Sequence, residues 1–143
     1  MDEYEGLKLD NQLCFTLYAC SREIIKLYKP YLSKLDLTYT QYITLLVIWE
    51  KNAISVKELG DQLYLDSGTL TPVLKKLEAK QIIVRKRSEL DERIMIVTLT
   101  ESGINLKNRA VEIPNQIFCE TQLNIEEAVL LKDSLAKLLN KIT

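Results

Sequence analysis

The stretch that decides the fold is residues 54–99, ISVKELGDQLYLDSGTLTPVLKKLEAKQIIVRKRSELDERIMIVTL. Its first part predicts a short helix that opens at Ile54, a turn over residues 64–68, and a second helix that runs to about Lys80. On the second helix three apolar residues recur at helical spacing, at Leu70, Leu74 and Leu77. Two short helices joined by a tight turn are the pattern of a helix-turn-helix.

Two β-rich runs follow the second helix. Residues 82–87 and 93–99 are rich in Ile and Val, and the polar segment 88–92 separates them, so they predict a β-hairpin with a charged tip. A helix-turn-helix followed by such a hairpin is a winged helix-turn-helix, which we place at about residues 40–100. The predicted fold class is therefore mostly α with a small β-hairpin wing.

Further helices are expected before and after this module. Residues 7–29 have apolar side chains near helical spacing, with Asp10 or Asn11 as a cap and Pro30 as the point where the helix bends or ends. Residues 41–51 are apolar nearly all round, as in a central buried helix. The amphipathic ends must bury their apolar stripes somewhere, which predicts a homodimer built from residues of about 7–31 and 101–142. A monomer whose arms fold back on the winged module is the alternative.

The C-terminal arm contains two predicted helices. One starts at residues 100–103 and leads to Pro114, and another runs from Asn124 to about Asn140. Asn124 followed by Glu127 has the spacing of a capping box.

Composition limits the class of protein. The 143 residues are 47% apolar and 27% charged, as expected of one globular domain covering 1–143. No apolar run approaches the roughly 18 residues of a membrane span, and the first five residues are acidic where a signal peptide is basic. We expect a cytoplasmic protein that does not contact a membrane.

The chain has no histidine, which excludes imidazole catalysis, Cys-His and Ser-His nucleophile pairs, and zinc sites that need histidine. Its three cysteines, Cys14, Cys20 and Cys119, are odd in number and lack CxxC spacing. We therefore expect free thiols, no metal and no cofactor, and any chemistry must run on other groups. The protein is not expected to be an enzyme.

A local basic patch stands out against the overall charge. Seven cations minus four anions between residues 75 and 93 give +3, whereas the whole chain carries −1. The cations are Lys75, Lys76, Lys80, Arg85, Lys86, Arg87 and Arg93. Short polar groups that can contact phosphates and base edges lie at the start of the second helix: Asp66, Ser67, Thr69 and Thr71. The patch indicates double-stranded DNA as partner, with a solvated charged face as the alternative.

Cys14 shares a helix face with Tyr18, four residues on. Tyr28 returns close to that face but lies roughly 21 Å further along the axis, so it can reach only a Cys14 of an antiparallel partner helix, where Tyr39 could join it. Phenolic O–H groups that donate to sulfur would favour the thiolate. The alternative is that Cys14 is an inert core residue. Cys20 is about 9 Å along the axis from Cys14, too far for a disulfide within the helix.

Four blocks in order strongly resemble the OhrR branch of the MarR family of winged-helix repressors. They are LDNQLCFTLY (9–18), LTYTQY (37–42), LYLDSGTLTP (63–72) and RKRSELDER (85–93). The resemblance implies a homodimeric repressor that leaves a pseudopalindromic operator when organic hydroperoxides oxidise a cysteine. It implies that Cys14 is the sensing residue and that Tyr18, Tyr28 and Tyr39 surround it.

The same resemblance assigns the DNA contacts. It places Asp66, Ser67, Gly68, Thr69, Thr71 and Lys76 where the family's recognition helix meets DNA, and it matches Asp91 and Arg93 to a wing motif whose Arg enters the minor groove. The first oxidation product, a sulfenic acid, is resolved in this family by a low-molecular-weight thiol or by a second cysteine. Cys119 lies in the right region for the second route, although the sequence is nearer to the single-cysteine members.

Two other functions compete with this hypothesis. One is a MarR-like repressor released by a small phenolic or aromatic ligand, with Cys14 structural. The other is a thiol peroxidase, for which no Arg or Thr partner is evident beside Cys14.

Overall fold

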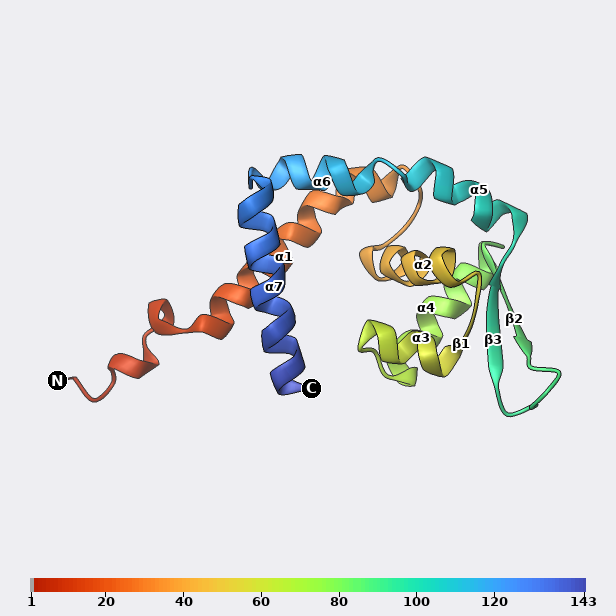
Figure 1. Ribbon diagram of the computed structural model, residues 1–143, viewed down its shortest axis with the longest axis horizontal. Helices are drawn as coiled ribbons and strands as arrows, with labels where there is room; N and C mark the ends of the chain where they lie inside the picture. Colours follow the sequence, from red (N-terminus) through yellow and green to blue (C-terminus); the bar gives the residue numbers. More distant parts are fainter. Residues whose placement is uncertain (1) are drawn as a thin grey trace. The chain divides into compact units, whose positions relative to one another are not determined.

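The computed structural model describes residues 2–143 (Figure 1). The chain divides into two compact units, the first ending at Val111 and the second comprising Glu112–Thr143. Helices dominate both units, and a three-stranded sheet lies in the first. Among the described helices, none has the length and apolar character that crossing a membrane requires.

The first unit contains two 3-10 turns, five helices and three strands among the described residues. In chain order they are η1 (Glu5–Leu7), η2 (Leu9–Asn11), α1 (Leu13–Ser33), α2 (Tyr39–Lys51), β1 (Ala53–Ser55), α3 (Val56–Leu63), α4 (Ser67–Ala79), β2 (Ile83–Arg87), β3 (Met95–Leu99) and α5 (Glu101–Ala110).

The bounds predicted for α1 were wrong at both ends. The helix begins at Leu13, because the preceding residues form separate turns in which the Asn11 side-chain amide donates to the carbonyl of Glu5 at 2.8 Å and not to a helix end. Pro30 lies inside α1, which continues to Ser33. A proline near the C-terminal turn removes one helical hydrogen bond, and here the next turn still forms.

The core of the first unit is built on α2. A capping box of Thr38 and Gln41 starts this helix, and the indole N–H of Trp49 donates to the carbonyl of Gly103 at 2.9 Å. The prediction of a central buried helix is confirmed. The largest fully buried apolar side chains come from α2, α3, α4 and the sheet: Leu45, Ile48, Leu59, Leu70, Leu74, Leu77, Ile83 and Val97.

The sheet has one strand that was not predicted. Its antiparallel order is β1-β3-β2, with Ile54 opposite Val97 and Arg85 opposite Val97 from the other side. Ile54 therefore belongs to β1 and not to the following helix; α3 begins at Val56, with the Ser55 hydroxyl accepting from the N–H of Glu58 at 3.1 Å. A strand of three residues is too short to show the alternation of apolar and polar residues, so the sequence pattern did not reveal β1.

The turn between α3 and α4 is shorter than predicted. Tyr64 has a left-handed conformation (φ 56°), and Asp66 caps α4, so Ser67 and Gly68 are already helical. Figure 1 shows α2, α3 and α4 grouped beside the strands, with the wing loop beyond β2 and β3. The fold class, mostly helical with a winged helix-turn-helix, is confirmed.

The second unit consists of α6 (Ile113–Thr121) and α7 (Ile125–Ile142). Pro114 stands in the first turn of α6, where a missing N–H costs least. The capping box of Asn124 and Glu127 is confirmed at the start of α7. No residue of α7 is buried, and its exposed large apolar side chains are Ile125, Val129, Leu130, Leu131, Leu135, Leu139 and Ile142.

Candidate nucleic-acid interface and cysteine site

The N-terminal end of α4 presents an exposed polar surface. Asp66, Ser67, Gly68 and Thr69 are all exposed, and Thr71 is half-buried. The carboxylate of Asp66 accepts the backbone N–H of Thr69 at 2.7 Å, and this hydrogen bond lowers the pKa of Asp66 below its usual value. Asp66 is therefore a charged cap that fixes the start of α4, and the neighbouring Ser67 and Thr69 are exposed beside it.

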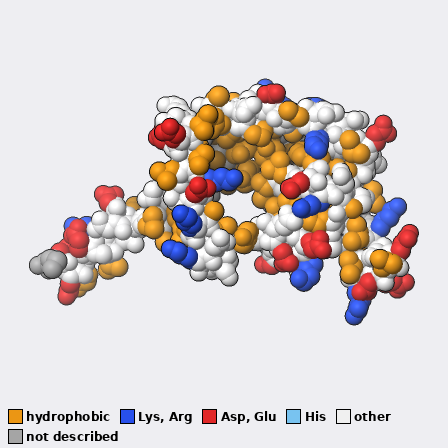
Figure 2. Space-filling view, viewed as in Figure 1, with side chains coloured by type: hydrophobic (Ala, Val, Ile, Leu, Met, Phe, Trp, Pro, Cys, Tyr) orange, Lys and Arg blue, Asp and Glu red, His pale blue; other side chains and the backbone are white. Residues whose placement is uncertain are grey.

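The cations of the predicted patch differ in what they contact. Lys75 and Lys76 are exposed on α4, and Lys86 and Arg87 are exposed on β2. Figure 2 shows that Lys and Arg side chains around the end of the wing lie among Asp and Glu side chains. The positive charge on this part of the surface is thus interspersed with negative charge, as the net +3 over residues 75–93 already implies.

Arg85 joins the wing to α4. Its guanidinium lies 3.0 Å from one carboxylate oxygen of Glu78, and its backbone N–H donates to the other at 3.1 Å. These hydrogen bonds lower the pKa of Glu78. Arg85 thus orients β2 against the recognition helix, and the DNA contact assigned to it stays a prediction.

The wing tip carries the Asp91–Arg93 pair. Asp91 accepts three hydrogen bonds from Arg93, from the backbone N–H at 3.0 Å, Nε at 3.1 Å and Nη2 at 3.0 Å. They lower the pKa of Asp91 and raise that of Arg93. The Arg93 side chain is 90% exposed, so Asp91 holds in one orientation a cation that projects into solvent.

Three tyrosines pack together where α1 meets α2. The ring centroids of Tyr28 and Tyr39 are 4.9 Å apart, and Tyr42 lies 5.6 Å from Tyr28 and 6.4 Å from Tyr39. Burial and then the neighbouring phenols raise the pKa of Tyr28 to about 12, and burial raises the pKa of Tyr39 and Tyr42. The cluster therefore holds neutral phenols that can donate hydrogen bonds. Sequence reasoning missed Tyr42, although its position three residues after Tyr39 places both on one helix face.

Cys14 and Tyr18 are exposed near the start of α1. The guanidinium of Arg22 donates to the Tyr18 hydroxyl at 3.2 Å and lies 5.5 Å from its ring centroid. Arg22 follows Tyr18 by one turn, a spacing that could have identified it. Because α1 is continuous from Leu13 to Ser33, Tyr28 lies several turns from the Cys14 of its own chain.

The other two thiols are also free and exposed, Cys20 on α1 and Cys119 on α6. Cys119 belongs to the second unit, so its proposed resolving role stays a prediction. Within residues 2–143 no group of three or more potential metal ligands is brought together.

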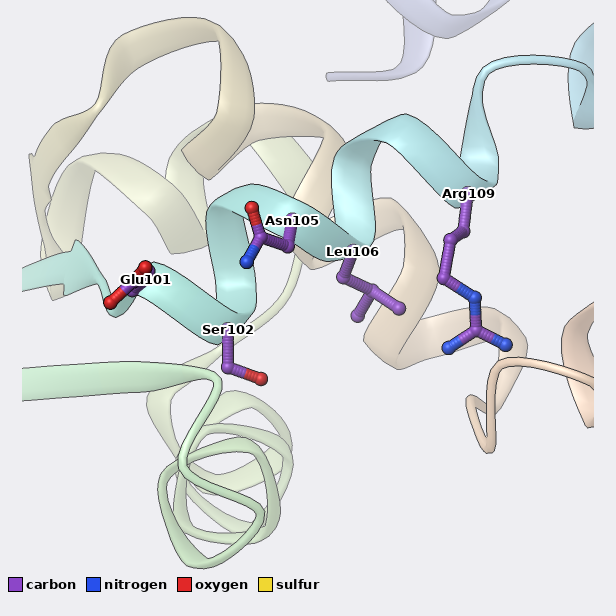
Figure 3. Close-up of a pocket in the computed structure, with 5 residues that line it drawn as sticks. All are labelled: Glu101, Ser102, Asn105, Leu106 and Arg109. Atoms are coloured by element: carbon purple, nitrogen blue, oxygen red, sulfur yellow. The ribbon is translucent and has the colours of Figure 1, made fainter.

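A shallow depression lies along α5. Figure 3 shows its lining side chains on successive turns of this one helix, with Glu101 and Arg109 at opposite ends. Arg109 is engaged elsewhere, since its guanidinium donates to the carbonyl of Lys34 at 3.0 Å. Leu106 is the one apolar residue among those drawn, and the depression is open to solvent along a single helix.

Comparison with known proteins places the chain among bacterial transcription regulators. The family model described as "Transcriptional regulator SarA/Rot" matches residues 26–110. The organic hydroperoxide resistance transcriptional regulator of Bacillus subtilis is 50% identical over 141 residues, which cover 99% of this chain and 96% of that protein. SarZ of Staphylococcus saprophyticus is 46% identical, covering 93% and 91%.

Solved structures give the same result. The structure of reduced AbfR bound to DNA has a TM-score of 0.80 at 34% identity, and the match covers 98% of both chains. Another of the matching structures is AbfR of Staphylococcus epidermidis. A mutant MarR from E. coli complexed with operator DNA has a TM-score of 0.83 at 26% identity, covering 97% of this chain and 99% of the other. These relatives are DNA-binding regulators and not enzymes.

Proposed function

The chain belongs to the OhrR branch of the MarR family of winged-helix transcriptional regulators, and from this premise we propose a homodimeric repressor that organic hydroperoxides release from its operator by oxidising Cys14. The observation that carries the proposal is the near full-length similarity to a regulator named for organic hydroperoxide resistance. The cluster of neutral tyrosines and the exposed cysteine supply the chemistry that such a sensor needs.

The DNA-binding part rests on the exposed end of α4 and on the wing. Asp66, Ser67, Gly68, Thr69, Thr71, Lys75 and Lys76 would face the major groove, and Arg93 the minor groove. The AbfR and MarR structures described above were both solved bound to DNA, which supports duplex DNA as the partner of this chain.

The homodimer is supported by apolar surface that each unit leaves uncovered. On α1 the exposed apolar side chains include Leu13, Phe15, Ile24 and Ile25, and α7 has no buried residue. Such faces are stable in water when a second copy covers them. Residues of about 7–31 and 101–142 would form the dimerisation region, and an antiparallel pair of α1 helices would bring Tyr28 and Tyr39 of one subunit to Cys14 of the partner subunit.

In this arrangement the tyrosines act as hydrogen-bond donors. The pKa of Tyr28, about 12, keeps its phenol protonated at neutral pH, so it can donate to the Cys14 thiolate. The sulfur attacks the terminal oxygen of the hydroperoxide, the O–O bond breaks, and the departing alkoxide takes a proton to become an alcohol. Sulfur is oxidised by two electrons to a sulfenic acid, and the hydroperoxide is reduced.

The sulfenic acid then condenses with a thiol and releases water. A low-molecular-weight thiol would give a mixed disulfide, whereas Cys119 would give a disulfide between cysteines of the protein. Mass spectrometry of the oxidised Cys119→Ser protein separates the two routes, because only the second requires Cys119.

The function is tested by fluorescence anisotropy of the reduced protein on a labelled duplex selected from random DNA, at one stated salt concentration. We expect tight binding that one equivalent of cumene hydroperoxide weakens and that dithiothreitol restores. Cys14→Ser should bind equally well and ignore the peroxide. A Cys14→Ser protein that still leaves DNA on oxidation would refute the sensor assignment, and release by a phenolic ligand at fully reduced thiols would favour a ligand-controlled repressor.

A further inference from the structure

The Lys80 side chain is directed away from the DNA-facing patch to which its sequence position assigned it. It caps the C-terminal end of α4, and its ammonium reaches back to the connection between α1 and α2. There it donates to the backbone carbonyl of Asp36 and to the side-chain oxygen of Gln41, the latter at 3.3 Å. The Asp36 carboxylate, 3.5 Å away, is 92% exposed, so the two uncharged oxygens are the main partners.

The Gln41 side chain connects Lys80 to the first turn of α2. The same oxygen that Lys80 contacts also accepts the backbone N–H of Thr38 at 3.1 Å, and the backbone N–H of Gln41 donates to the Thr38 hydroxyl at 3.2 Å. Gln41 is 3% exposed, so this oxygen has little access to water as a substitute partner. Lys80 and the cap of α2 are thus held by one buried group.

The other partner, Asp36, belongs to the turn that ends α1. Its φ of 55° lies in the left-handed region, and the N–H of Leu37 donates to the carbonyl of Leu32 at 3.0 Å. A left-handed residue closed by this hydrogen bond is a helix-ending motif of fixed geometry. Lys80 therefore donates to a carbonyl in a turn of defined backbone geometry.

The sensing cluster lies at the same junction. Tyr39, the first residue of α2, follows Thr38 directly, and its ring packs on Tyr28 of α1. A displacement of the Tyr39 backbone would shift the adjacent α2 cap or the turn at Asp36, and both contact Lys80. The buried leucines Leu70, Leu74 and Leu77 attach α4 to the core along its length, whereas the ammonium fixes its C-terminal end to this one place.

We propose that Lys80 is a positioning residue that couples the tyrosine cluster to the recognition helix, so that a change at Tyr39 reorients α4. In this proposal, the event that moves Tyr39 is the oxidation of the proposed redox function. The coupling between the first turn of α2 and α4 is reciprocal, so operator binding to α4 must also stabilise the first turn of α2.

The test compares Lys80→Met, which keeps most of the side-chain stem and removes the ammonium, with Arg109→Met. Arg109 is the matched control, because it also donates to a carbonyl of the same connection, that of Lys34, but from α5. Thermal unfolding of both variants establishes that they fold. Anisotropy on the selected duplex then gives the affinity before and after cumene hydroperoxide.

We expect the wild type and Arg109→Met to lose affinity on oxidation by about 5–150-fold, the usual range of allosteric coupling. Lys80→Met should bind DNA within about threefold of the wild type when reduced and lose less than about threefold when oxidised. A Lys80→Met protein that loses as much affinity on oxidation as the wild type would overturn the proposal.

A second measurement does not depend on the peroxide. Hydrogen exchange of the backbone N–H groups of Gln41 and Tyr42, which bond to Thr38, should slow when the reduced wild type binds the duplex. In Lys80→Met this slowing should disappear, and in Arg109→Met it should remain. If the wild type ignores peroxide but shows this pattern, the coupling stands and the redox function fails; equal slowing in all three proteins refutes the coupling.

Discussion

Replacing Gly103 by alanine tests how α5 is attached to the winged module. A Cβ at this position would lie 2.2 Å from the carbonyl oxygen of Ile82 and 3.1 Å from a methyl carbon of Leu99. The first distance is far inside van der Waals contact and involves backbone, so α5 or the start of β2 must move. The same turn supplies the carbonyl that accepts the indole N–H of Trp49 at 2.9 Å.

The expected cost follows from these contacts. Overpacking of a well-packed site costs about 1–3 kcal/mol, and a strained or lost hydrogen bond of the buried indole adds about 1–3 kcal/mol. The higher helix propensity of alanine returns about 1 kcal/mol. The free energy of unfolding should therefore fall by roughly 3 kcal/mol, which for a chain of this size lowers Tm by about 10 °C.

Gly68→Ala is the matched control, since it makes the same substitution in an exposed helical position. Its Cβ would meet only the Asp66 carboxylate at 3.4 Å, an ordinary contact. Stability should stay equal or rise by up to about 1 kcal/mol, whereas DNA affinity should fall because Gly68 lies at the proposed interface. Urea unfolding at one protein concentration, followed by the fluorescence of the single tryptophan, Trp49, measures both variants. Equal stability of Gly103→Ala and wild type would refute the steric argument.

Two further predictions concern the tyrosine cluster and the wing. Because the folded-state pKa of Tyr28 is raised from 10.0 to about 12, its contribution to stability is present below pH 10 and is lost as pH rises toward 12. The urea midpoint of Tyr28→Phe should therefore fall less steeply with pH over this interval than the midpoint of the wild type. Equal slopes for the two proteins would contradict the burial argument. Arg93→Ala should weaken operator binding and reduce the slope of log affinity against log salt by about 1 if the cation contacts phosphate or the minor groove, whereas an unchanged slope would remove Arg93 from the interface.

The sequence was sufficient where a pattern is long or chemically specific. The three leucines of α4 and the capping box of Asn124 and Glu127 each lie where predicted, because helical spacing and cap chemistry are local properties. The winged module could be recognised from the leucine spacing of α4 together with the two β-rich runs. The short strand β1 could not, since its assignment depends on pairing Ile54 with the distant Val97.

The site was predicted less completely than the fold. Tyr28 and Tyr39 could be grouped as partners of a sensing thiol, but the addition of Tyr42 depends on how α1 packs against α2. The engagement of Arg85 by Glu78 depends on the packing of β2 against α4. Sequence spacing gives the positions of side chains on one element, whereas contacts between elements require the tertiary structure.

The way the cations are engaged bears on how such a protein could be switched. Of the seven cations in the predicted patch, Arg85 is neutralised by Glu78, Arg93 is held by Asp91, and Lys80 is directed to the α1–α2 connection. The other four cations of the patch, Lys75, Lys76, Lys86 and Arg87, are exposed. The net charge of the whole chain is −1, so its overall charge supplies little non-specific attraction to DNA. In the proposed homodimer, operator affinity would then depend on how well two recognition helices and two wings match the grooves. An interface that depends on fit is lost after a small rotation of α4, which is the change that a sensor at the α1–α2 junction could produce.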